Sequence, residues 1–316
     1  MVELYPNRIY NDDMKPLKLY VRFLMLNPSQ LGLLTNLGVT VTKTLDADVN
    51  AIFSDQFFIE ANINTLPVLD YLQVATSGLD QIPLSHPKLA HAVVSGSRGV
   101  FNKPMAEYVL SHVLSVYQNH RFFGQTQKEQ QWRPSRHNEE LAGKRVAILG
   151  MGQIGKQIAK TFSFFGAKVD AFNRSEVDSM YVHQVYRLED MKANLANYEI
   201  VVASLALNEQ TKGILSADVL QSLSPKAIFV NVGRSELLDE GALVSLLQEK
   251  KIRHAVLDTF SKEPLPKDHP YWALENVTLT PHISFTSVQN LERMFQSLYA
   301  NLQLYLQNER LINQFK

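Results

Sequence analysis

Residues 145–155 read RVAILGMGQIG, an apolar run followed by glycines at 150, 152 and 155. The apolar run predicts a buried strand, and the amphipathic residues that follow, through Phe165, predict a helix. Gly150 permits the tight turn between them, Gly152 lets a ligand approach the backbone, and Gly155 lets the helix pack close to the strand. A pyrophosphate suits such a turn, because free N–H groups at a helix start favour an anion. The alternative interpretation is a purely structural turn.

The composition is that of an ordinary soluble protein, with 45% apolar and 20% charged residues among 316. Lys and Arg together number 31, as do Asp and Glu, so there is no electrostatic case for a nucleic acid or an anionic membrane. The absence of cysteine excludes disulfides, thiol nucleophiles and thiolate metal sites. We see neither a signal peptide nor an apolar run of the ~20 residues that a membrane span needs, and expect a cytoplasmic protein.

The first region alternates short apolar runs with helical segments, a pattern typical of a parallel α/β sheet. Its predicted strands are Leu17–Leu26, Val39–Thr44, Ala51–Phe53 and Leu72–Ala75. The last of these leads into a small-residue loop with Ser77 and Gly78, the kind of position where such sheets bind ligands, although a plain turn is the alternative. A second polar loop, residues 95–99, carries Arg98, which either meets a carboxylate or is solvated.

The second region predicts a larger sheet around the glycine motif. A long helix, Lys103–His120, has one apolar stripe, and Gln125–Glu140 is predicted to be a polar connection. With the strand before the glycines, apolar runs predict six strands, the number in a Rossmann-type doubly wound sheet. The further strands are Ala167–Phe172, Glu199–Leu205, Ala227–Val232, His254–Leu257 and Val277–Leu279. The last segment, Thr286–Leu311, is mostly helical in pattern.

The residues eighteen to twenty positions beyond Gly155 indicate which dinucleotide is bound. In NAD sites an Asp or Glu usually stands there to bind the ribose 2′-hydroxyl. This chain has Asn173, Arg174 and Ser175 instead, and a guanidinium suits a 2′-phosphate. We therefore expect NADP(H) to be preferred, with NAD(H) as the lesser cofactor. The alternative is that the arginine is merely exposed and that the adenosine pocket does not distinguish the two cofactors.

Three loops that follow predicted strands carry side chains suited to carbonyl reduction, namely Arg234, Glu263 and His282. That chemistry needs a cation for a substrate carboxylate, a proton donor, and a partner for the donor. Histidine is the natural acid and base near neutral pH, and a nearby carboxylate stabilises its imidazolium. Each residue has a structural alternative: a surface ion pair, a backbone cap and an interior hydrogen bond, respectively. No His-x-x-x-His or acidic cluster suggests a metal.

Four motifs, in the same order along the chain, resemble those of the D-isomer-specific 2-hydroxyacid dehydrogenases. The resemblance extends over most of the chain and includes the cofactor loop, the catalytic-arginine motif, the "LDVFxxEPLP" signature and the catalytic-histidine motif. The matching segments are Gly150-x-Gly152-x-x-Gly155, Asn231–Val232–Gly233–Arg234, Leu257–Asp258–Thr259–Phe260 with Glu263–Pro264–Leu265–Pro266, and Thr280–Pro281–His282.

The resemblance implies a role for each matching residue. Arg234 would bind the carboxylate and carbonyl of a small 2-oxo acid, and His282 would donate the proton in reduction and accept it in oxidation. Glu263 would hold the imidazole, and backbone N–H groups of Ser77 and Gly78 would meet the substrate carboxylate. The implied cofactor site comprises Gly150, Gly152, Gln153, Ile154, Gly155, Asn173, Arg174, Ser175, Val232, Gly233, Asp258 at the nicotinamide carboxamide, and His282.

The resemblance also implies the domain organisation. Residues 1–99 and 286–316 would form a smaller flavodoxin-like α/β substrate-binding domain, and residues 100–285 a Rossmann dinucleotide-binding domain. The last helix would return to the first domain, and Lys103–His120 would contribute to a homodimer. The Asn-Arg-Ser segment at 173–175 is similar to the NADP-preferring, glyoxylate/hydroxypyruvate-reductase-like branch.

Several sequence departures leave the substrate open. Residues 76–80 differ from the usual glycine-valine-aspartate loop, and Ser235 replaces the glycine that commonly follows the arginine. A phosphoglycerate dehydrogenase-like activity would need extra cations, for which Lys88, Arg98 and Lys103 are candidates. A dinucleotide-sensing corepressor is a second class of function, disfavoured because no interaction tail is evident. Formate oxidation is disfavoured because Glu263 stands where that branch has another partner.

Overall fold

The computed structural model describes residues 16–22, 24–76, 78, 79 and 82–315. Its contacts divide the chain into two units: unit 1 comprises Met1–Val100 and Val288–Lys316, and unit 2 comprises Phe101–Ser287. The predicted domain boundaries, after residues 99 and 285, fall slightly before these points. The assignment of substrate binding to unit 1 stays a prediction.

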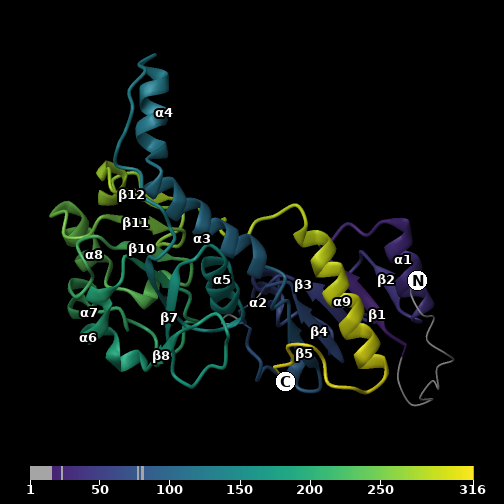
Figure 1. Ribbon diagram of the computed structural model, residues 1–316. Coiled ribbons are helices and arrows are strands. Elements are labelled where there is room, and N and C mark those ends of the chain that lie inside the picture. The colour runs from purple at the N-terminus through teal and green to yellow at the C-terminus, as the bar shows by residue number, and fades with distance from the viewer. Residues whose placement is uncertain (1–15, 23, 77, 80–81, 316) are drawn as a thin grey trace. The chain divides into compact units, whose positions relative to one another are not determined.

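Unit 1 is built on a parallel sheet, whose described strands have the flavodoxin-like order β2-β1-β3-β4-β5 (Figure 1). Helices α1 and α9 contribute to the apolar core on one face of this sheet, and α2 contributes to the core on the other. The elements are β1 Lys18–Val21, α1 Pro28–Asn36, β2 Thr40–Thr42, β3 Ala51–Ser54, α2 Gln56–Asn62, β4 Tyr71–Val74, β5 Val93–Gly96 and α9 Asn290–Leu306.

Helix α9 returns to the first sheet and is fixed there by a buried amide. The side chain of Asn301 is completely buried and donates to Gln73 Oε1 and Ser95 Oγ, both at 3.1 Å. Its Oδ1 accepts the backbone N–H of Ile312 at 2.8 Å. Because burying an unpaired amide is costly, these bonds favour one position of α9 and the following tail over others.

Unit 2 contains a larger parallel sheet, whose described strands have the order β12-β11-β10-β9-β6-β7-β8. The order reverses between β6 and β9, as in a doubly wound dinucleotide-binding sheet, so the predicted fold class is confirmed. Helices α6, α7 and α8 pack on one core, while α3 packs against α5. The elements are α3 Asn102–Tyr117, α4 His120–Lys128, β6 Arg145–Leu149, α5 Gln153–Phe164, β7 Lys168–Phe172, β8 Gln184–Tyr186, α6 Met191–Asn194, β9 Ile200–Ala203, α7 Ala217–Gln221, β10 Ile228–Asn231, α8 Glu240–Gln248, β11 His254–Leu257 and β12 Val277–Leu279.

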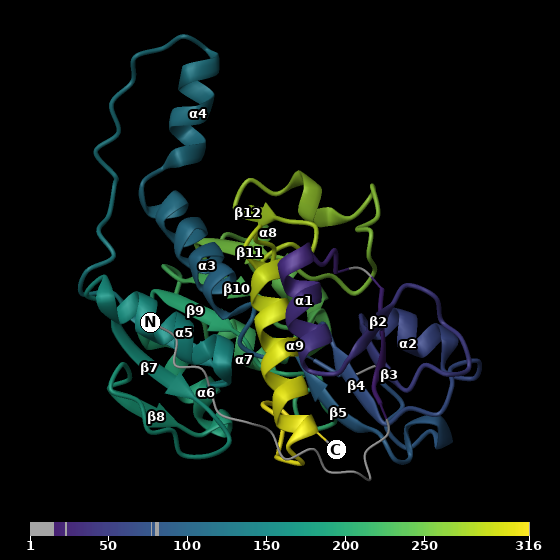
Figure 2. The same ribbon diagram turned by 90° about the vertical axis from the view of Figure 1, so that its right-hand side faces the viewer.

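The predicted helix Lys103–His120 corresponds to α3, which ends at Tyr117, and a second helix, α4, begins at His120. Asn119 adopts a left-handed conformation with φ 53°, which ends α3 and starts α4 in a new direction. Helix α4 therefore occupies part of the segment predicted to be a polar connection, and both views show it projecting from the rest of unit 2 (Figures 1 and 2). Within the described part of the chain, no helix combines the length and apolarity required to cross a bilayer.

The strand predictions differ from the structure at three places. The run Leu17–Leu26 contributes only β1, because the strand ends at Val21 and Asn27 already caps the start of α1. Ser95 and Gly96, predicted to lie in a loop, belong to β5. Strand β8 was missed because it is three residues long and lies at the edge of its sheet, where its side chains are only partly buried.

We predict that His254, on β11, makes the protein less stable in acid. Burial, reinforced by the positive charges of Arg121 and Arg253, lowers the pKa of His254 to about 4. Between that value and about 6.5 the unfolded chain binds a proton that the folded chain excludes, so stability falls as the pH falls. The effect amounts to about 3 kcal/mol once both states have titrated. Urea unfolding at pH 7 and pH 4.5 measures most of this change in the free energy of unfolding. In His254→Asn the change between the two pH values should be smaller.

The control for this experiment is His91→Asn, which changes an exposed histidine of unit 1. It should keep the pH dependence of the wild type. An unchanged dependence in His254→Asn would contradict the assignment to His254.

Candidate active site

The turn after β6 is shaped by two glycines that no other residue could replace without movement. Gly150 has φ 96°, and a Cβ added there would lie 3.0 Å from the backbone of Leu205. A Cβ on Gly155 would lie 2.0 Å from the carbonyl oxygen of Gly150, far inside van der Waals contact. Helix α5 therefore approaches the turn as closely as the backbone allows.

Gly152 and the start of α5 offer an anion site. A Cβ on Gly152 would meet no atom within 4 Å, so the space above the turn is open. Gly152 is also the N-cap of α5 and provides no side chain to cap the helix, which leaves the amides of the first turn, with Gln153 and Ile154, available. The residues present thus fit the pyrophosphate of a dinucleotide.

The segment expected to meet the adenosine ribose lies beside the glycine turn. Asn173 follows β7, and its Oδ1 accepts the backbone N–H of Met151 at 3.2 Å. Its amide nitrogen donates to the backbone oxygen of Ser175 at 3.0 Å and contacts the hydroxyl of the same residue at 3.3 Å. The exposed guanidinium of Arg174 donates to Gln210 Oε1.

The loop after β10 places Arg234 at the same edge of the sheet. Val232 and Gly233 are buried, and Asn231 holds the loop by accepting the Gly233 N–H at 3.1 Å and donating to the Arg234 carbonyl at 3.2 Å. A Cβ on Gly233 would lie 2.8 Å from a methyl group of Leu237 and 3.0 Å from the Leu205 carbonyl oxygen, so a larger residue would require these neighbours to shift. The Arg234 side chain is half-buried.

Glu263 and His282 form a direct pair. Nδ1 of His282 lies 2.9 Å from Oε2 of Glu263, while Oε1 accepts the Phe260 N–H at 3.0 Å. An ionised carboxylate only accepts hydrogen bonds, so Nδ1 carries the hydrogen in this contact. Among the described residues none bonds the other ring nitrogen, Nε2, which is left to exchange a proton with a substrate.

Asp258 holds the loop that carries His282. His282 has φ 54°, a left-handed conformation that is unfavourable for a residue other than glycine. The next two backbone N–H groups, of Ile283 and Ser284, donate to the completely buried Asp258 carboxylate at 2.8 and 2.9 Å. The contact of Asp258 with a nicotinamide carboxamide stays a prediction, and the structure adds this positioning role.

Tyr108 and Thr280 extend the same network, although the sequence analysis assigned no role to either. The Thr280 hydroxyl donates to Asp258 Oδ1 at 2.6 Å, and the Tyr108 hydroxyl lies 2.6 Å from it on the other side. Because Thr280 has one hydrogen, Tyr108 is the donor in the second bond. Burial raises the pKa of the Tyr108 phenol, which therefore stays protonated. The apolar stripe of the helix had suggested only packing for this tyrosine.

The substrate loop predicted after β4 is described in part. Gly78 belongs to unit 1, and its carbonyl accepts the Thr76 hydroxyl at 2.8 Å. Ser77 lies outside the described residues, and the roles of both stay predictions. Within the described residues, no group of three or more His, Asp or Glu side chains is arranged to hold a metal.

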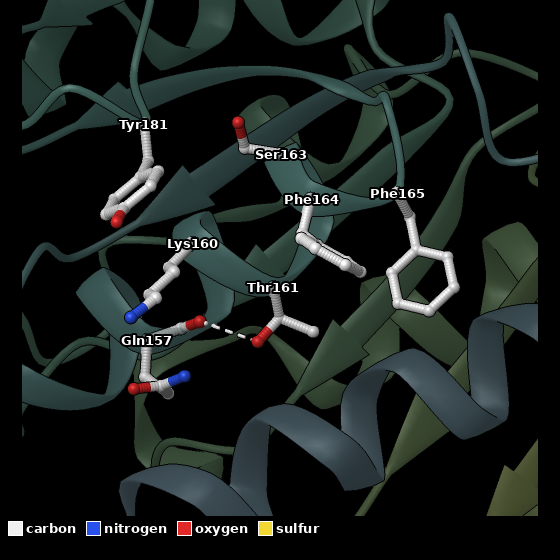
Figure 3. Close-up of a pocket in the computed structure, with 7 residues that line it drawn as sticks. All are labelled: Gln157, Lys160, Thr161, Ser163, Phe164, Phe165 and Tyr181. Carbon is white, nitrogen blue, oxygen red and sulfur yellow. Dashed lines mark hydrogen bonds between the residues drawn. The ribbon is translucent and has the colours of Figure 1, made fainter.

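A surface hollow of about 320 Å³ lies along the second half of α5 (Figure 3). It is lined by Lys160, Phe164, Phe165, Tyr181 and three small or polar residues of the same helix. No predicted site residue borders it. The hollow is therefore separate from the candidate active site.

The residues of this site, apart from Ser77, Gly78 and Tyr108, lie within one match to a known family. Residues 110–284, more than half of the chain, match the family model of the D-isomer specific 2-hydroxyacid dehydrogenase, NAD binding domain. The chain belongs to this family.

Similar proteins extend the likeness beyond that domain. The chain is 30% identical over 258 residues to a glyoxylate reductase of Aeropyrum pernix, a match that covers 78% of this chain and 76% of the relative. It is 28% identical over 256 residues to the glyoxylate/hydroxypyruvate reductase HPR3 of Arabidopsis thaliana, with 79% and 77% covered.

Solved structures show the same two-part fold. A family member from Aeromonas salmonicida has a TM-score of 0.83 at 26% identity, with 96% of this chain and 99% of the other covered. A second, from Xanthobacter autotrophicus in complex with NADPH and MES, has a TM-score of 0.79 at 26% identity, with 96% and 98% covered.

This D-2-hydroxyacid dehydrogenase is an oxidoreductase that uses a nicotinamide dinucleotide and acts on the CH–OH group of a small 2-hydroxy acid, or on the corresponding 2-oxo acid. The glycine turn, Arg234 and the Glu263–His282 pair are the parts of unit 2 that suit this chemistry. Their individual roles remain predictions from the resemblance.

We predict that Glu263→Gln lowers kcat for 2-oxo acid reduction by roughly 10-fold at neutral pH, because the imidazolium loses its anionic partner. Reduction requires protonated His282, so the decline of activity at alkaline pH should begin at a lower pH in the variant. Initial rates between pH 5 and pH 10 measure both effects. Glu249→Gln, which changes an exposed glutamate of unit 2, is the matched control. Identical pH profiles for Glu263→Gln and the wild type would show that Glu263 does not act as the partner of His282.

Proposed function

We propose that this enzyme is a glyoxylate/hydroxypyruvate-type reductase that prefers NADP(H) to NAD(H). The observation that carries the chemistry is the 2.9 Å contact between His282 Nδ1 and Glu263, which orients one ring nitrogen outward as a proton donor. The names of the relatives from Aeropyrum pernix and Arabidopsis thaliana support the substrate class. Arg174, at a place where NAD sites have an acid, supports the cofactor preference.

The proposed reduction divides the work between three side chains. When bound, the reduced nicotinamide supplies a hydride to the carbonyl carbon of the 2-oxo acid. Arg234 pairs with the substrate carboxylate and stabilises the negative charge that grows on the carbonyl oxygen. His282 gives its Nε2 proton to that oxygen, which completes the alcohol, and Glu263 stabilises the imidazolium before the transfer. In oxidation the same nitrogen accepts the proton.

A homodimer is part of the proposal. Helix α4 has nine residues, and Thr126 is its one buried side chain among the described residues. A helix this short is marginal without packing, so a surface of a second copy would stabilise it. Helix α4 and the segment that follows it, residues 129–140, form an arm of unit 2. This arm carries Trp132, which is fully exposed. Helix α3, predicted to join two copies, leads directly into this arm.

For the dimer we expect sedimentation equilibrium to give twice the chain mass of 35.8 kDa. Trp132→Glu should weaken self-association by at least about tenfold, because it places a charge in the apolar contact. Met25→Glu, which changes another highly exposed apolar side chain, on unit 1, is the control. A monomeric wild type at micromolar concentration would contradict this part of the proposal.

The reaction itself is tested by following nicotinamide absorbance with purified enzyme. NADPH and NADH are each offered with glyoxylate, hydroxypyruvate, pyruvate and 2-oxoisocaproate, and 3-phosphoglycerate is offered with the oxidised cofactors. We expect glyoxylate or hydroxypyruvate with NADPH to give the highest kcat/KM, at least about tenfold above NADH.

The other outcomes separate the alternatives. Oxidation of 3-phosphoglycerate as the best reaction would replace the proposed substrate with a phosphorylated one. Binding of NADPH without turnover of any 2-oxo acid would favour a dinucleotide sensor. A preference for NADH would leave the chemistry intact but remove the proposed cofactor preference.

A further inference from the structure

Two arginines lie just beyond the carboxyl ends of neighbouring strands in the sheet of unit 2. Arg174 stands two residues beyond β7, and Arg187 directly follows β8. The two strands are parallel neighbours, and Phe172 is in register with Tyr186. The rings of these two residues stack with centroids 5.1 Å apart, which fixes the end of β8 against the end of β7.

Hydrogen bonds connect both arginines to each other and to the glycine turn. The guanidinium of Arg187 donates to the backbone carbonyl of Arg174. The Asn173 N–H donates to the Tyr186 carbonyl at 3.0 Å, and the Asn173 side chain accepts the Met151 N–H at 3.2 Å. The end of β8 is therefore part of the same edge that carries the proposed cofactor turn.

The charge on both arginines remains available. Both side chains are exposed, and the groups that they contact are neutral: Arg174 donates to the Gln210 side-chain oxygen, and Arg187 donates to the Arg174 carbonyl. The carboxylate of Asp190 accepts the backbone N–H of Arg187 at 3.1 Å, not its guanidinium. Across the described residues, neither guanidinium forms a salt bridge, whereas Arg22 and Arg253 are each paired with a carboxylate.

We propose that Arg187 joins Arg174 in a two-arginine site for the 2′-phosphate of NADP(H), an inference that rests on the proposed cofactor site. A phosphate monoester is close to doubly charged at neutral pH and has three acceptor oxygens, so a second guanidinium finds both charge and hydrogen-bond partners there. Each arginine side chain has five N–H donors, and hydrogen bonds within the protein occupy only a few of them. Arg187 thus acts as a specificity-determining residue that distinguishes the two dinucleotides.

The test uses nucleotides that represent only the adenosine end of the cofactor. Calorimetric titration of the full chain with 2′,5′-ADP and with 5′-ADP should show 2′,5′-ADP binding at least about tenfold tighter. Arg187→Gln should reduce this ratio by about tenfold through weaker 2′,5′-ADP binding, with the affinity for 5′-ADP unchanged within about twofold. Arg187→Lys keeps a charge and should retain part of the ratio.

Three comparisons decide the interpretation. Arg310→Gln, an exposed arginine of unit 1, should bind both nucleotides as the wild type does. Equal binding of 3′,5′-ADP and 2′,5′-ADP, or equally effective competition by inorganic phosphate, would indicate a general anion site and overturn the proposal. An unchanged ratio in Arg187→Gln, or equal weakening of both nucleotides, would also overturn it, because a purely structural arginine affects both alike.

The proposal and the proposed function fail in different ways. A wild-type ratio near one, with reduction of glyoxylate by NADH, would remove the two-arginine site and leave the reductase. An Arg187-dependent preference for 2′,5′-ADP, without turnover of any 2-oxo acid, would support the site and remove the reductase.

Discussion

The close approach of α5 to the turn after β6 is the constraint on which the cofactor end of unit 2 depends. No side chain fits at Gly155, because its Cβ would lie 2.0 Å from the Gly150 carbonyl. The approach directs the uncapped start of α5 toward the open space beside Gly152. Parallel strands then bring the loops after β7 and β10 to the same edge of the sheet, where a doubly wound sheet binds its ligand.

A buried carboxylate organises the catalytic end in a comparable way. Asp258 accepts three hydrogen bonds from the loop after β12, and two of these come from the N–H groups that follow His282. They compensate for the unfavourable left-handed conformation of His282, so the imidazole is held beside Glu263 rather than left to a flexible loop. Tyr108 reaches this network from α3, which links the long helix to the position of the catalytic candidate.

The sequence was sufficient where one local rule governs the structure. The glycine motif, the strands β11 and β12, and the loops with Arg234 and His282 follow from apolar runs and from turns that require particular residues. It was insufficient where tertiary contacts decide: the break at Asn119, the edge strand β8, and the hydrogen bonds of Tyr108 and Thr280 have no distinct local pattern. Because β8 was not predicted, there was also no reason from the sequence to expect Arg187 beside Arg174.

The most direct test of the account is His282→Ala, compared with the wild type for both turnover and NADPH binding. We expect kcat for the best 2-oxo acid to fall by at least about 1000-fold, because the proton donor is lost. The NADPH dissociation constant, measured by fluorescence, should rise by no more than about fivefold, since the glycine turn and the arginines at the phosphate end are unchanged. Equal loss of binding and turnover would show that His282 is a structural residue, and retained turnover would show that another group supplies the proton.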